Sequence, residues 1–159
     1  MSELAAAIHR LLLDRGETVA TAESLTGGLV GAALTETPGA SATYRGGLIV
    51  YATDLKATLA GVGESLLVDR GAVDPDVAAA LADGARTRLG STWGLGLTGV
   101  AGPDRQDSQP VGTLHVGVAG RLGEPTVTTV MLSGDRSEIR LGAVENALTV
   151  LHRAIADAE

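Results

Sequence analysis

The feature that most constrains the fold of this chain is the interleaving of short apolar runs with longer segments of helical periodicity. Short apolar runs predict strands at residues 18–21, 47–52, 92–98, 111–119 and 126–132. Helical spacing of apolar residues predicts helices at residues 4–15, up to residue 34, at 75–89 and at 135–155. This alternation is typical of a sheet with helices packed on both faces.

Local signals support the two longest predicted helices. Asp74 precedes Pro75, an N-cap residue followed by proline at the first helical position, and Gly90 follows the end of that helix. Asp135 and Glu138 form a capping-box pattern at the start of the last helix. The last two strands are joined by a short polar turn, so we expect them to be antiparallel neighbours. The prediction is therefore one domain over residues 1–159, a three-layer α/β/α sandwich with a mixed sheet.

The composition limits the classes of function. The 159 residues are 45% apolar, with 22 glycines, no phenylalanine and one tryptophan, so small side chains allow helices to approach the sheet closely. A net charge of −7 argues against a general nucleic-acid or anionic-membrane surface. With no cysteine, disulfides, thiolate zinc sites and a cysteine nucleophile are excluded. We see no signal-peptide core and no membrane-spanning run, and we expect a cytoplasmic homo-oligomer.

Lys56 is the only lysine among 12 basic residues, the others being arginine. Arginine keeps its proton in proteins, whereas a desolvated lysine can release it, so position 56 is a candidate for a base. Chance is the alternative, because a single lysine must stand somewhere. Tyr51, one of two tyrosines, lies just upstream and could orient the amine or relay a proton; it could equally be a half-buried strand aromatic.

The segment 24–28 (SLTGG) lies where a predicted strand turns into a helix. Its hydroxyls and the free amides of the helix could hold an anion, Ser24 could be a nucleophile, or the hydroxyls could only cap the helix. A serine nucleophile needs a base, and the three histidines lie in predicted helices and a strand away from glycine-rich loops. Lys56 is the better candidate, because Ser–Lys pairs are an accepted variant of triad catalysis. No histidine pair or calcium-loop pattern predicts a metal site.

Several candidate residues fall at predicted strand ends. Ser24, Tyr51 and Thr98 would meet at the carboxyl edge of the sheet, where ligands of such folds bind. The loop 98–103 (TGVAGP) adds glycine-rich backbone, which turns alone could also explain. Arg136 and Arg140 are four residues apart on the last predicted helix and could bind phosphate or carboxylate, unless they only form a solvated helix start.

Five segments, in order, resemble those of the CinA carboxy-terminal domain family. They are residues 22–28 (AESLTGG), Arg45-Gly46 with Val50-Tyr51 and Lys56, residues 98–103, residues 110–113 (PVGT), and residues 134–136 (GDR) with Arg140. The resemblance covers nearly the whole chain. It extends to the stand-alone, PncC-like members that are nicotinamide-mononucleotide amidohydrolases.

The resemblance implies an α/β/α domain with a mixed sheet that hydrolyses the carboxamide of nicotinamide mononucleotide, without metal or cofactor. Ser24 matches the family's nucleophile, Lys56 its base and Tyr51 their partner. The positions that match the lining of the nucleotide pocket are Thr26, Gly27, Gly28, Arg45, Thr98, Gly99, Ala101, Gly102, Arg136 and Arg140.

The chain departs from the family pattern in the loop 104–109. Arg105 and Gln106 stand where many members have glycines, and Gln109 stands where they have a lysine. This loop is therefore expected to contact a ligand differently. A non-catalytic nucleotide-binding or regulatory module with the same pocket, and a purely structural subunit, are the alternative functions.

Overall fold

The computed structural model describes residues 1–158 and contains a five-stranded mixed sheet in the order β2-β1-β3-β4-β5. β1 is parallel to both β2 and β3, β4 is antiparallel to β3, and β5 is antiparallel to β4. The strands are β1 (Val19–Glu23), β2 (Tyr44–Ile49), β3 (Trp93–Gly99), β4 (Thr113–Ala119) and β5 (Thr126–Met131). The predicted mixed sheet and its antiparallel last pair are confirmed.

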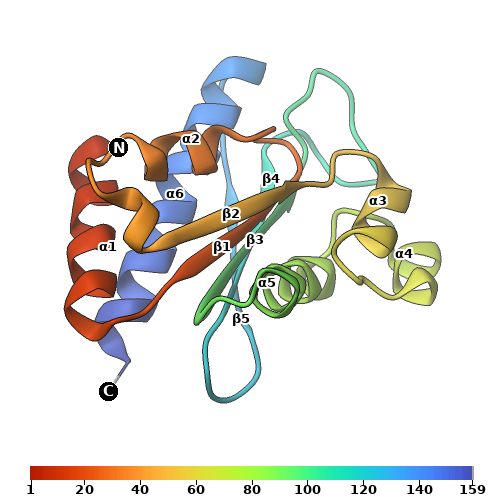
Figure 1. Cartoon of the computed structure of the whole chain (residues 1–159). Coiled ribbons are helices and arrows are strands. Elements are labelled where there is room, and N and C mark those ends of the chain that lie inside the picture. Colours follow the sequence, from red (N-terminus) through yellow and green to blue (C-terminus); the bar gives the residue numbers. More distant parts are fainter. Residues whose placement is uncertain (159) are drawn as a thin grey trace.

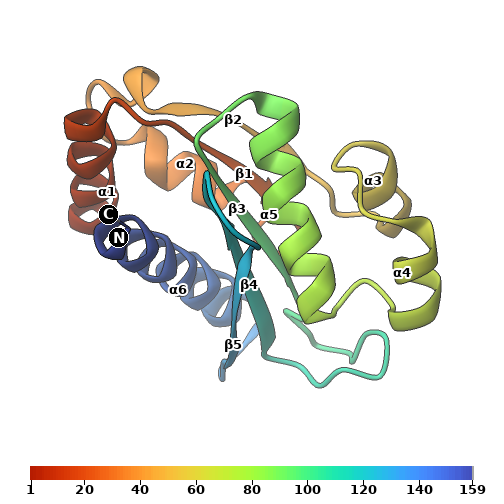
Figure 2. The same cartoon turned by 90° about the horizontal axis from the view of Figure 1, so that it is seen from below.

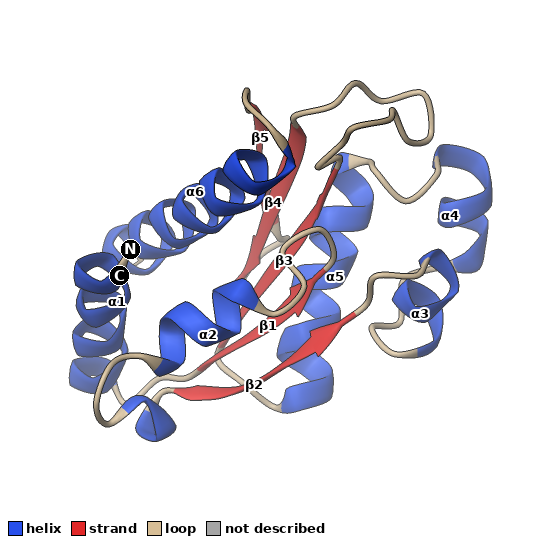
Figure 3. Ribbon diagram, turned by 90° about the horizontal axis from the view of Figure 1, so that it is seen from above, coloured by secondary structure: helices blue, strands red, loops and turns tan. Residues whose placement is uncertain are grey.

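Helices cover both faces of this sheet, as Figures 1, 2 and 3 show. On one face lie α1 (Ser2–Arg15), α2 (Leu29–Thr35) and α6 (Arg136–Asp157). The other face is covered by α5 (Pro75–Leu89), with α3 (Thr53–Thr58) and α4 (Glu64–Arg70) beside it, and a short 3-10 turn, Ala40–Ala42, precedes β2. The three-layer α/β/α architecture is therefore confirmed.

The core is divided by the sheet into two apolar clusters. The larger one joins α1, α2 and α6 to the sheet and includes Leu12, Leu95 and Leu148, all fully buried. The smaller one joins α5 to the opposite face and includes Ala20, Ala22 and other mostly small side chains. Within the described residues, no helix is both long and apolar enough to cross a bilayer.

Glycines bring α5 very close to the sheet. A Cβ atom at Gly94, Gly96 or Gly117 would overlap backbone atoms of α5 at Ala78 or Ala82. The helix can therefore lie almost in contact with the strand backbone, which requires the small residues noted in the composition.

The sequence predicted the N-caps of α5 and α6 better than it predicted the elements of residues 44–70. Asp74 caps α5 through Asp76 N, and Asp135 forms a complete capping box with Glu138 at α6, as expected. β2 begins and ends three residues earlier than the predicted strand, 47–52. α3 and α4 were not predicted, because each is only about two turns long and neither has a side-chain N-cap.

Candidate active site

The predicted nucleophile and base meet at the carboxyl end of β1 and β2. Ser24 directly follows β1, and Lys56 lies on α3, which begins four residues after β2. The Lys56 Nζ atom is 3.0 Å from Ser24 Oγ, 2.7 Å from the carbonyl oxygen of Val50 and 3.3 Å from that of Tyr51. Lys56 is only 1% exposed and Ser24 is 8% exposed. The expected proximity of these two side chains is thus present in the structure.

The pairing of the parallel strands fixes this geometry. The Val50 N–H donates to the Glu23 carbonyl oxygen at 2.8 Å, while the Val50 carbonyl accepts from Lys56. Because Glu23 is covalently joined to Ser24, these bonds close a ring through Glu23, Ser24, Lys56 and Val50. The distance between the two candidate groups is therefore set by the register of β1 and β2.

Burial of Lys56 favours its neutral form. Desolvation lowers the pKa of Lys56 to about 8, and the negative charge of Asp107 opposes this shift. A neutral amine has two N–H bonds and one lone pair. If the carbonyls of Val50 and Tyr51 accept the two N–H groups, the lone pair remains for the Ser24 hydroxyl. The arrangement can therefore remove the proton of Ser24.

A pocket of about 380 Å³ opens beside the pair. Its lining comes from four stretches of the chain, namely Ser24, Leu25, Tyr51, Ala52, Thr53, Gly99, Val100, Ala101, Gly102, Asp104, Gln106 and Arg136. The structure thus brings the predicted residues Tyr51, Gly99, Ala101, Gly102 and Arg136 to Ser24. A pocket of this volume suits a small-molecule ligand.

Arg136 joins two walls of this pocket. Its guanidinium donates to the Tyr51 hydroxyl at 3.2 Å and to the carbonyl oxygen of Gly102. Tyr51 is 61% exposed, so it is not a half-buried strand aromatic. Tyr51 contacts Lys56 through its carbonyl, whereas its hydroxyl contacts Arg136.

The N–H groups at the start of α2, which were expected to be able to hold an anion, are already bonded within the chain. The Glu23 carboxylate already accepts from the Thr26 hydroxyl at 2.6 Å and from the N–H groups of Gly28, Val30 and Gly31 at 3.2, 2.9 and 3.0 Å. An acidic side chain of the chain itself therefore fills the place of an external anion. Thr26, Gly27 and Gly28 do not line the pocket.

The two arginines of α6 do not form the expected shared fork. Only Arg136 lines the pocket. Arg140 instead donates to the carbonyl oxygens of Leu25 at 2.9 Å and Thr26 at 3.3 Å, so it holds the turn after Ser24 in place. Arg136 therefore lines the pocket, whereas Arg140 supports the backbone.

Two further predicted binding residues lie elsewhere. The Thr98 hydroxyl is buried and donates to the Ala72 carbonyl oxygen at 2.6 Å, so it ties β3 to the segment before α5. Arg45 lies near the amino end of β2, where its Nε donates to the carbonyl oxygen of Leu89, the last residue of α5, at 2.6 Å. The structure does not bring either side chain to the pocket.

Five lining residues were not identified from the sequence: Leu25, Ala52, Thr53, Val100 and Asp104. Leu25, Ala52 and Val100 each directly follow a predicted residue, and Thr53 is two positions after Tyr51. Nearness to a strand end was the only signal for these four. Asp104 belongs to the loop 104–109, which departs from the family pattern. Gln106, one of those departures, also lines the pocket.

None of the three histidines lines the pocket, and two of them are hydrogen-bonded elsewhere. His9 Nδ1 is 2.8 Å from Thr43 Oγ1, and His115 Nδ1 is 2.8 Å from Thr129 Oγ1. Burial lowers the pKa of His115, but the residue lies on β4 and does not line the pocket. Within residues 1–158, no group of three acidic or histidine side chains is placed to hold a metal ion. Lys56 is therefore the base that the geometry offers.

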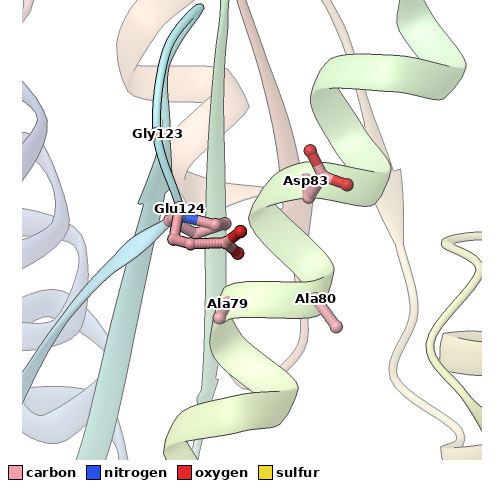
Figure 4. A pocket seen from close by; sticks show the side chains of 6 residues that line it. Ala79, Ala80, Asp83, Gly123 and Glu124 are labelled. Atoms are coloured by element: carbon pink, nitrogen blue, oxygen red, sulfur yellow. The ribbon is translucent and has the colours of Figure 1, made fainter.

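A second hollow of about 350 Å³ lies between α5 and the turn that joins β4 to β5 (Figure 4). Figure 4 shows the carboxylates of Asp83 and Glu124 among its lining, beside Ala79 and Ala80. This hollow contains no pair of nucleophile and base, and its negative charge disfavours an anionic ligand. The pocket beside Ser24 is the better candidate for a reaction.

Comparisons with known proteins agree on one family. The sequence model of one protein family, the CinA C-terminal domain, matches residues 1–155 of this chain. A CinA-like protein of Frankia casuarinae is 54% identical over 147 residues, which are 92% of this chain and 34% of that protein. The chain thus spans about a third of the length of the curated relatives it matches.

Solved structures share the whole fold. A competence-damaged protein (CinA) superfamily protein of Klebsiella pneumoniae superposes with a TM-score of 0.94 at 28% identity, over 99% of this chain and 98% of the other. The competence/damage inducible protein CihA of Agrobacterium tumefaciens gives a TM-score of 0.93 at 37% identity, over 98% and 95% of the two chains.

Proposed function

This chain belongs to the CinA C-terminal domain family, and from that premise we propose that it hydrolyses the carboxamide of nicotinamide mononucleotide to nicotinic acid mononucleotide and ammonia. The observation that carries the proposal is the buried contact of 3.0 Å between Lys56 Nζ and Ser24 Oγ beside a pocket of about 380 Å³. A buried lysine with a lowered pKa is suited to activate a serine, and such pairs are known in hydrolases.

The first half of the reaction forms an acyl-enzyme. Ser24 Oγ attacks the carboxamide carbon while the neutral Lys56 amine accepts the hydroxyl proton. The tetrahedral intermediate then breaks its carbon–nitrogen bond, and Lys56 gives its proton to the leaving ammonia. The product of this step is an ester between Ser24 and the nicotinoyl group.

The second half releases the acid. Lys56, neutral again, accepts a proton from a water molecule that attacks the ester carbon. Collapse of the second tetrahedral intermediate breaks the bond to Ser24 Oγ, which takes the proton back from Lys56. No metal or redox cofactor takes part in this sequence.

Backbone N–H groups near Ser24 can stabilise the oxyanion. The N–H groups of Leu25 and Ala101 belong to pocket residues, and neither has an acceptor among residues 1–158. Removing one preorganised donor of this kind typically costs about 3 kcal/mol in the barrier. The N–H of the residue after the nucleophile serves this purpose in many hydrolases.

The charged and aromatic lining suits a pyridine mononucleotide. Arg136 lies at the pocket edge and can bind the 5′-phosphate with its remaining N–H groups. The exposed ring of Tyr51 lies beside Ser24 and can pack on the flat, positively charged pyridinium ring. Asp104 and Gln106 can accept hydrogen bonds from ribose hydroxyls.

Incubation with nicotinamide mononucleotide, with quantification of ammonia and identification of the pyridine product, tests the proposal. We expect equal amounts of ammonia and nicotinic acid mononucleotide, and no product from Ser24→Ala. Binding of the nucleotide without turnover by the unsubstituted protein would instead support a non-catalytic nucleotide-binding module.

A further inference from the structure

Glu23 is a buried carboxylate that the proposed reaction does not use. It is 2% exposed and is the last residue of β1, directly before Ser24. Its two oxygens accept four hydrogen bonds, all from the segment 26–31 that follows the nucleophile. Burying a charge is costly unless the charged group is hydrogen-bonded. The segment 26–31 supplies those hydrogen bonds to Glu23, so the carboxylate and this segment stabilise each other.

The side chain of Glu23 bonds to the segment after Ser24, whereas its main-chain carbonyl bonds to the residue that follows β2. The carboxylate points to the α2 side of the sheet, where its Oε1 atom accepts from Thr26 and from the N–H groups of Gly28 and Val30. The carbonyl oxygen accepts from Val50, the residue whose own carbonyl holds Lys56. Glu23 therefore fixes both the turn that carries Ser24 and the strand that positions the base.

The packing around the carboxylate leaves little freedom. A Cβ atom at Gly31 would lie 2.7 Å from the Tyr44 hydroxyl and 3.5 Å from Glu23 Oε2, so only glycine lets α2 approach this closely. Arg140 holds the same turn from outside through the carbonyls of Leu25 and Thr26. The turn is thus fastened at its N–H groups by Glu23 and at its carbonyls by Arg140.

We propose that Glu23 is a positioning residue that holds the Ser24 turn at the distance and orientation needed for attack. It does so by serving as an internal anion for the first N–H groups of α2. This inference rests on the proposed role of Ser24 as nucleophile. Since the carboxylate already occupies those N–H groups, a phosphate must bind elsewhere, which leaves Arg136 as its partner in the pocket.

The test measures the rate at which Ser24 Oγ is sulfonylated, with loss of fluoride, by a small serine-reactive sulfonyl fluoride, which needs no nucleotide. Glu23→Gln keeps the shape but presents an NH₂ group to one of the four donors. We expect its labelling rate to fall at least about tenfold, since small misplacements of a reacting group have effects of this size or larger. Leu34→Ala, a packing deletion in the same helix, is the stability control, and it should label at nearly the unsubstituted rate well below its unfolding temperature.

Two variants of Thr26 provide the test if Glu23→Gln does not fold. Thr26→Val removes the 2.6 Å bond to the carboxylate, whereas Thr26→Ser retains a hydroxyl that can donate it. We expect slower labelling in the first and nearly normal labelling in the second. Equal labelling rates in Thr26→Val, Thr26→Ser and the unsubstituted protein would overturn the positioning role. If Ser24 of the unsubstituted protein is not labelled at all, the nucleophile assignment itself fails, and this inference fails with it.

Discussion

Lys56 donates to the carbonyl of Val50 and contacts the hydroxyl of Ser24, although 32 residues separate it from that serine. The contact depends on the parallel pairing of β1 and β2, which brings two strand ends together. The amine is buried among hydrogen-bond acceptors, and the negative charge of Asp107 partly opposes the effect of this burial on its pKa. This environment is the basis of the first three predictions.

Substitution of Lys56 distinguishes a base from a cation. Lys56→Arg keeps the charge but cannot accept a proton at accessible pH, and Lys56→Met keeps much of the apolar stem without charge. Both should lower kcat by roughly two to four orders of magnitude, as expected for loss of a general base. Affinity for the nucleotide, measured by calorimetry, should fall much less. A Lys56→Arg protein with nearly normal kcat would disprove the base assignment.

The rate should depend on pH through the protonation of Lys56. Only the neutral amine accepts the Ser24 proton, and burial lowers its pKa to about 8. We therefore expect kcat/KM to rise about tenfold per pH unit below this pKa and to level off above it. Measurement from about pH 6 to about pH 10, which brackets the pKa of Lys56, checks the profile. A rate that is independent of pH through about 8 would contradict it.

Asp107 should set the position of this profile. Its charge raises the pKa of Lys56 against the effect of burial, and its Oδ2 accepts from the Ala72 N–H at 2.9 Å. Asp107→Asn removes the charge but keeps an oxygen for Ala72, so the midpoint of the pH–rate curve should move to lower pH. Asp69→Asn removes an exposed carboxylate of α4 and should leave the midpoint in place. A shift of the same size in both variants would rule out a specific effect of Asp107.

The arginines of α6 should have separable effects on binding. Arg136→Ala should weaken binding of nicotinamide mononucleotide by roughly tenfold or more, and that of nicotinamide riboside much less, because only the mononucleotide has a phosphate. Arg140→Ala should instead lower the unfolding temperature and affect both ligands similarly, since its guanidinium binds the backbone at Leu25 and Thr26. Calorimetric titration of both ligands into both variants provides the measurement. Equal losses for the two ligands in Arg136→Ala would remove its role in phosphate binding.

Two helix-interior glycines should respond in opposite ways to alanine. At Gly84 on α5, a Cβ atom would overlap the carbonyl of Ala60, so Gly84→Ala should destabilise by at least about 1–3 kcal/mol. At Gly142 on α6, the nearest atoms would be the Leu132 side chain at 3.6 Å, and Gly142→Ala should stabilise by up to about 1 kcal/mol. Urea unfolding of both variants measures the difference. Similar changes in both would show that close packing of α5 is not required.

The sequence was sufficient for the architecture because strands and long helices carry their own periodicity and caps. Ser24 and Tyr51 could also be placed near each other, since both follow the carboxyl ends of strands. Thr98 was expected beside them for the same reason, but its buried hydroxyl donates to the Ala72 carbonyl instead. The roles of Glu23 and Arg140 could not be predicted in this way. Both residues bond mainly to backbone N–H or C=O groups, and every residue type has a backbone, so the sequence gives no sign of these bonds. The pattern of two arginines four residues apart is the same whether the second arginine binds a phosphate or a backbone carbonyl.

The helices α3 and α4 illustrate the same limit. These helices are too short to show an apolar period, and the contacts around them join residues far apart in the sequence. Lys56 on α3 contacts Ser24, 32 positions earlier. Thr98 fastens the segment after α4 through Ala72, a contact between residues 26 positions apart. Such long-range hydrogen bonds determine the local structure, but no local pattern records them.

The hydrogen bonds from Arg136 to Tyr51 and Gly102 can form only late in the synthesis of the chain. Arg136 begins the last helix, whereas Tyr51 and Gly102 leave the ribosome much earlier, so the pocket walls can join only after α6 has emerged and docked. A nascent chain that has completed its sheet would still lack this closure. The proposed reaction would then have its complete pocket only once α6 has docked.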